Sequence, residues 1–127
     1  FDLINETGEK RKQKLASMYQ IIDYLVFNSD KNMLITNVVG DVQFCSKKIS
    51  TFIGIDSDIF RTLRISDLLG MSMNHVLSNI ERKKTPVISF KNLVLKYEDT
   101  SKKIKEIQVF PIYDSDNIVS NMIFIII

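Results

Sequence analysis

Three long runs of strand-forming residues in the last third of the chain limit its possible folds more than any other feature. They span residues 87–97, 103–113 and 118–127 and are rich in β-branched and aromatic side chains. Only short polar segments, residues 98–102 and 114–117, separate them. Connections this short join neighbouring antiparallel strands. The sequence therefore predicts an antiparallel meander over residues 87–127.

The final run is apolar at consecutive positions, so both of its faces need cover. We expect its inner side to contribute to the core. The outer side is predicted to be covered by a helix near the N-terminus, either of the same chain or of a second copy.

Residues 6–24 are predicted to form that helix, because strong helix formers dominate and no proline interrupts them. Apolar residues follow a coiled-coil-like spacing at Leu15, Met18, Ile22 and Leu25. Three interpretations stay open: a surface helix of its own domain, a dimerising or signal-carrying helix, and a basic nucleic-acid contact. Nucleic acid is the least favoured, because 17 basic residues face 15 acidic ones and the net charge is only +2.

Two very short strands, residues 33–36 and 42–45, precede a short helix. Gly40 and Asp41 form the turn between them. Ser46 is expected to cap the helix, and Gly54 to end it.

Short helical segments are expected to follow. One of residues 56–58 caps the first, and Ser66 caps a second that ends at Gly70. Residues 71–84 form the one longer helix, and Pro86 ends helical structure before the meander.

Composition excludes several classes of site. With one cysteine and one histidine, the chain has neither an internal disulfide nor a cysteine- or histidine-rich metal cluster. We expect Cys45 to be a buried core residue. No catalytic motif appears, so the chain itself is predicted to be non-catalytic. No signal peptide is visible, and we expect a cytoplasmic domain excised from a larger protein, with membrane tethering of that protein left open.

The order of these elements resembles the PAS family. The resemblance rests on the turn Asn37-Val-Val-Gly40-Asp-Val42, on Ser46 at the helix start, on "FIG" at residues 52–54, on "ISDLL" at 65–69 and on "FPIYDSDNIVS" at 110–120. It implies an α+β fold with a five-stranded antiparallel sheet, short helices on one face and an N-terminal helix. Residues 18–127 would form the PAS domain, and residues 1–17 a helical linker.

The resemblance also implies signalling, usually upstream of an output domain such as a histidine kinase of a two-component system. The predicted function is a module that senses a small molecule and relays a conformational change. The alternative is a ligand-free module that works by dimerisation or docking, through the helix seam and the outer face of the sheet.

A small apolar or amphipathic ligand would lie among nine candidate residues. They are Phe44, Phe52, Ile53, His75, Val76, Ile80, Phe90, Met122 and Phe124. Haem ligation through His75 is a less favoured alternative. In haem-binding members of the family the ligand position corresponds to a residue nearer Ser72, about one helical turn from His75. Flavin photochemistry is not expected, because residues 58–69 lack the family's reactive-cysteine motif.

Overall fold

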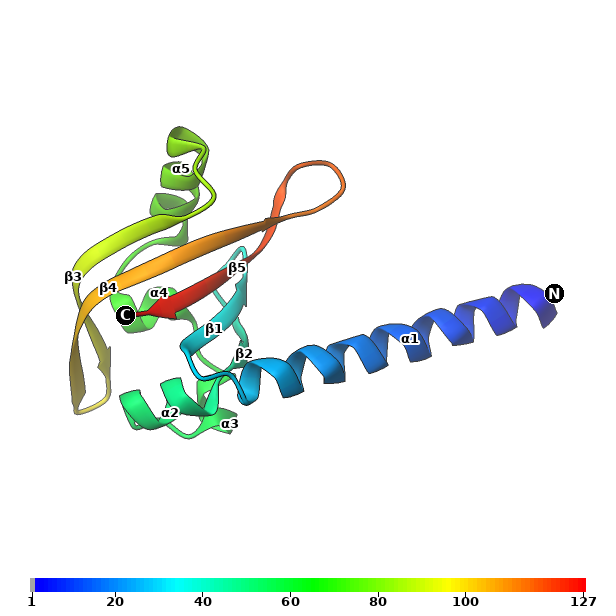
Figure 1. Ribbon diagram of the computed structural model, residues 1–127, viewed down its shortest axis with the longest axis horizontal. Coiled ribbons are helices and arrows are strands. Elements are labelled where there is room, and N and C mark those ends of the chain that lie inside the picture. Colours follow the sequence, from blue (N-terminus) through cyan, green and yellow to red (C-terminus); the bar gives the residue numbers. More distant parts are fainter. Residues whose placement is uncertain (1) are drawn as a thin grey trace.

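The computed structural model describes the backbone of residues 2–127 and the side chains of residues 8–127. Phe1, the first residue of the predicted linker, lies outside this range. The described elements follow one another along the chain as drawn in Figure 1. They are α1 (Asp2–Phe27), β1 (Asn32–Asn37), β2 (Val42–Cys45), α2 (Lys47–Ile53), α3 (Ser57–Phe60), α4 (Ile65–Leu69), α5 (Met73–Lys83), β3 (Ile88–Tyr97), β4 (Thr100–Tyr113) and β5 (Val119–Ile126).

The strands form one five-stranded sheet in the order β2-β1-β5-β4-β3, and every neighbouring pair is antiparallel. The predicted meander is therefore confirmed, and β5 lies at the centre of the sheet. Helix α2 contacts β1, while α4 and α5 contact β3. These helices cover one face of the sheet, which we call the inner face, so the predicted α+β architecture is confirmed.

The turns of the meander are tighter than the sequence indicated. Strand β4 begins at Thr100, so only Glu98 and Asp99 join it to β3, with Glu98 in the left-handed region at φ 51°. The predicted turn over residues 98–102 was too long. In the β4–β5 turn, Asp114 Oδ1 accepts hydrogen bonds from the backbone N–H groups of Asp116 and Ile118.

The predicted ends of α2 are confirmed. Ser46 Oγ accepts from the Ile49 N–H at 3.1 Å, and Gly54 ends the helix at φ 82°. The predicted cap of α4 was wrong, because Arg64 stands at its start and Ser66 lies inside it. Arg64 is held extended by an isolated antiparallel bridge to Asp41, so the helix begins directly afterwards. Its predicted end at Gly70 is confirmed.

Replacing Ser46 by Ala is expected to lower the free energy of unfolding by about 2–3 kcal/mol. The fully buried Ser46 hydroxyl caps α2, accepts from the Met33 N–H and donates to the Lys31 carbonyl. Its loss leaves the buried Ile49 N–H, and the partly buried Met33 N–H and Lys31 carbonyl, without this partner. Urea unfolding followed by circular dichroism measures the change.

Ser72 offers a matched control, because its hydroxyl caps α5 and the residue is exposed. Ser72→Ala should cost about 1 kcal/mol or less. Equal losses in the two variants would show that Ser46 contributes only as a helix cap.

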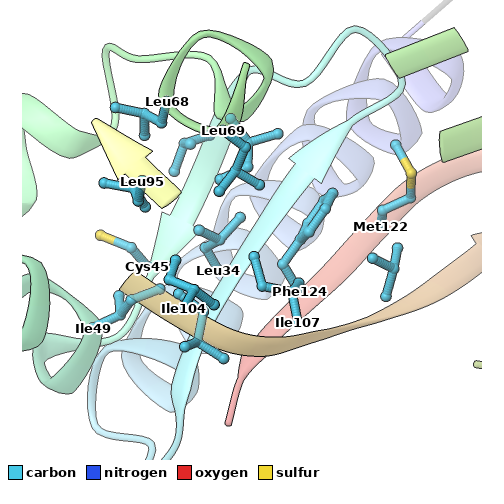
Figure 2. Packing of buried hydrophobic residues seen from close by; sticks show 14 of the residues in the cluster. Leu34, Cys45, Ile49, Leu68, Leu69, Leu95, Ile104, Ile107, Met122 and Phe124 are labelled. Carbon is cyan, nitrogen blue, oxygen red and sulfur yellow. The ribbon is translucent and has the colours of Figure 1, made fainter. Parts of the chain in front are cut away.

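The core lies between the inner face and the helices. Antiparallel partners share a face of the sheet, so the register defines a row that crosses all five strands. The row is Cys45, Leu34, Phe124, Val109 and Ile88. Each of these side chains is no more than 2% exposed. Figure 2 shows Leu34, Phe124 and Ile107 converging from three different strands.

Helix α1 does not cover the outer side of β5. It contacts β2 at the edge of the sheet, and most of its length runs away from the domain (Figure 1). The prediction that this helix covers β5 within the same chain was wrong, and the outer side chains Ile123 and Ile125 stay half-exposed. Cover by a second copy remains a prediction. No helix among the described residues is long and apolar enough to span a bilayer.

Candidate functional site

Most of the predicted ligand-lining residues pack against one another in the core. Ile53, Val76, Ile80, Met122 and Phe124 belong to one hydrophobic cluster and are no more than 2% exposed. Phe52 and Phe90 are partly buried at the edge of this cluster. The Lys102 ammonium lies 4.5 Å from the centre of the Phe52 ring, a cation–π geometry that fixes Phe52 near the surface.

Phe44 does not point toward these residues. It pairs with Ile35, whereas its neighbour Cys45 pairs with the buried Leu34 on the inner face. The register between β1 and β2 shifts between Ile35 and Thr36, so the strict alternation of β2 is interrupted. Phe44 therefore lies on the outer face, opposite to its predicted place.

His75 lies on the exposed side of α5, whereas the next residue, Val76, faces the core. The imidazole contacts the Phe90 ring at a centroid distance of 5.9 Å, and its Nε2 is 3.5 Å from Asn79 Nδ2. This placement does not fit an axial ligand to a haem enclosed between sheet and helices. Among the described residues, no group of three or more His, Cys, Asp or Glu side chains could hold a metal ion.

Cys45 is fully buried, so its predicted place in the core is confirmed. Burial raises the pKa of its thiol, partly offset by the nearby Arg61 guanidinium. Because the thiolate is the reactive form, a raised pKa keeps Cys45 unreactive at neutral pH.

An apolar row crosses the outer face of the sheet. By register, Phe44, Ile35, Ile123 and Phe110 are successive cross-strand partners on β2, β1, β5 and β4. Met33 and Ile125 form a second pair beside this row. We call these six residues the outer-face patch. Only Phe44 is buried, and the other five are half-exposed.

Polar side chains border the outer-face patch. Asn121 Nδ2 donates to Gln43 Oε1 at 2.8 Å on one side. On the other, Glu106 accepts from Gln108 and lies 4.0 Å from the Lys91 ammonium. An apolar patch with a polar rim is typical of a protein–protein contact surface.

The predicted coiled-coil residues of α1 face solvent. Their exposed fractions are 66% for Leu15, 48% for Met18, 39% for Ile22 and 63% for Leu25. We call these four residues the α1 seam. Ile21 and Tyr24, also on this helix, are exposed as well. Nothing in the described part of the chain covers the seam, so its apolar spacing is not explained by packing within one copy.

A second stripe of α1, which the sequence analysis missed, attaches the helix to the domain. Tyr19, Asp23 and Val26 follow the same spacing of three and four as the seam. Val26 is buried, the Tyr19 and Phe44 rings are 4.7 Å apart, and Asp23 Oδ1 lies 2.5 Å from Arg61 Nη2. The spacing of Tyr19 and Val26 was visible in the sequence, but the ion pair joins residues far apart in it.

A second ion pair lies at the β1–β2 turn. Arg64 Nε donates to Asp41 Oδ1 at 2.9 Å, and Asn37 Nδ2 donates to Asp41 Oδ2. The Asn37 hydrogen bond and the Arg64 guanidinium lower the pKa of Asp41. Asn37 Oδ1 also accepts from the backbone N–H groups of Val39 and Asp41, which explains how Asn37 forms this turn.

No protein-family model matches the sequence, and no curated protein matches it. Solved structures do match. The PAS domain of an HTR-like protein from Haloarcula marismortui aligns with a TM-score of 0.62 at 12% identity, over 94% of this chain and 98% of that one. A PAS domain from Colwellia psychrerythraea aligns with a TM-score of 0.66 at 14% identity, over 87% of this chain and 95% of that one. A PAS domain from a two-component sensor histidine kinase aligns with a TM-score of 0.62 at 8% identity, over 88% of this chain and 96% of that one. The chain therefore has the PAS fold.

Proposed function

We propose that this chain is a non-catalytic, cytoplasmic signalling module that self-associates through the α1 seam and the outer-face patch. A change in this association would be passed to an attached output domain. The observation that carries the proposal is the exposure of all four seam residues. PAS domains described as parts of a sensor histidine kinase and of the nitrogen regulation protein NR(II) support a signalling context.

The free energies of burial and association favour an interface that is larger than the seam alone. Burying a half-exposed Leu, Met or Ile side chain contributes about 1 kcal/mol, so four seam residues on each of two chains contribute about 8 kcal/mol. Association costs about 4–15 kcal/mol. A seam-only pair would therefore be weak, and the half-exposed outer-face patch supplies the additional apolar area.

Helix α1 contacts the outer-face patch at one place, next to the seam. Tyr19 on α1 contacts Phe44, the first residue of the outer-face row. A second chain lying along α1 would therefore come close to the patch.

Small-molecule sensing is the other function predicted from the sequence. It requires the tightly packed core residues, such as Val76, Met122 and Phe124, to separate around a ligand. Association requires no such rearrangement, which is why it is the function proposed first.

Hydrogen exchange measured over a range of protein concentrations tests this proposal. We expect the amides of residues 15–25 to exchange more slowly as concentration rises, because association buries their side chains and stabilises the helix. Helix α5 is the internal control, since the proposed interface does not include it. Exchange in α1 that is independent of concentration would contradict self-association through the seam.

A further inference from the structure

One of the contacts that attach α1 to the domain is made by Arg61, a residue outside both proposed contact surfaces. Arg61 directly follows α3, and its backbone N–H donates to the Ser57 carbonyl. Its guanidinium reaches Asp23 on α1. The ion pair joins α1 to α3 over 38 positions of the sequence.

The backbone of Arg61 is held next to the core. The preceding residue, Phe60, is fully buried. The Ser57 carbonyl, one turn earlier, lies 3.9 Å from the sulfur of the buried Cys45. A movement of Phe60 or Cys45 would therefore displace Arg61, and with it the contact to Asp23.

The guanidinium end of the Arg61 side chain is only partly buried. The side chains of Arg61 and Asp23 are 32% and 34% exposed. Both line a surface hollow of about 340 Å³ between α1 and α3. Within the described residues, Arg61 Nε is buried without a hydrogen-bond partner. Swinging out into the hollow would hydrate this group, so the paired arrangement competes with a solvated one.

We propose that the Asp23–Arg61 pair is a latch that sets the direction of α1 and so regulates the α1 seam. Arg61 acts as a positioning residue, because a displacement of the core residues beside it would change the direction of a helix that extends into solvent. Helix α1 has 26 residues, about 39 Å at 1.5 Å per residue, so a small rotation at Asp23 moves its N-terminal turns by several ångströms. The proposal rests on the proposed function, because the surface that the latch regulates is the association seam.

The latch is tested by hydrogen exchange of α1 in chains that also carry Ile22→Lys, so that the protein is monomeric whether or not the wild type associates. Asp23→Asn and Arg61→Gln should each increase the exchange rates of residues 19–27 about two- to fivefold, with α5 unchanged. The charge swap Asp23→Arg with Arg61→Asp should restore slow exchange. Arg64→Gln, which breaks the Asp41–Arg64 pair at the β1–β2 turn, is the matched control and should leave α1 unchanged.

Equal exchange in the Asp23→Asn, Arg61→Gln and Arg64→Gln chains would overturn the latch, as would a charge swap that restores nothing. A second measurement uses chains with native Ile22, where Asp23→Asn should alter the dimer dissociation constant several-fold more than Arg64→Gln. If no dimer exists at any concentration, the proposed function fails, while the exchange result still decides whether the latch exists.

Discussion

Replacing Ile22 by Lys is expected to convert an associating chain into a folded monomer, weakening association at least about 100-fold. Ile22 is central in the α1 seam and is already 39% exposed in the single chain, so a lysine there does not disturb the core. In the associated state the same lysine would place an ammonium group, on each chain, in an apolar contact. Desolvating these charges costs several kcal/mol, and about 2.7 kcal/mol already corresponds to 100-fold. Sedimentation equilibrium measures the change.

Gln13→Lys is the matched control. Residues 13 and 22 are nine positions apart, about two and a half turns of helix, so they lie on opposite sides of α1. The control adds the same charge away from the seam and should associate as the wild type does. An Ile22→Lys chain that associates as tightly as Gln13→Lys would show that the seam is not the interface.

Replacing Phe124 by Ala is expected to lower the free energy of unfolding by about 3–5 kcal/mol. Phe124 is 1% exposed and pairs with Leu34 and Val109 at the centre of the inner face. Its neighbours are held by the sheet register and cannot collapse fully into the space left behind. Because total stability of such domains is about 5–15 kcal/mol, the loss should be plain in urea unfolding at room temperature.

Ile118→Ala is the control for this change, because Ile118 is 63% exposed beside the β4–β5 turn. It should change stability by no more than about 0.5 kcal/mol. A loss below about 1 kcal/mol for Phe124→Ala would show a loosely packed interior. That result would favour the small-molecule function over self-association.

The parts of the fold that depend on neighbouring residues could be predicted from the sequence. The cap at Ser46, the left-handed end at Gly54 and the meander all follow from short patterns. Features set by distant partners could not. Asn92 adopts φ 58° inside β3, between the Lys91–Glu106 and Leu93–Ile104 pairs with β4. The register shift beside Ile35 depends on how β2 pairs.

The candidate site was predictable to a similar degree. The spacing of Leu15, Met18, Ile22 and Leu25 marked the seam, because helical periodicity is local. Phe44 was assigned to the wrong face, since a bulge reverses the side of every later residue in a strand. Arg61 was missed, because nothing near it in the sequence indicates a partner on α1.

Native mass spectrometry of the chain, compared with its denatured mass, tests the central claim of self-association most directly. We predict a species at twice the 14.7 kDa mass of one chain, with no excess mass that is lost on denaturation. A single-chain mass at every concentration would contradict the claim. A mass above an integer number of chains, with the excess released on denaturation, would instead identify a bound small molecule and favour the sensor.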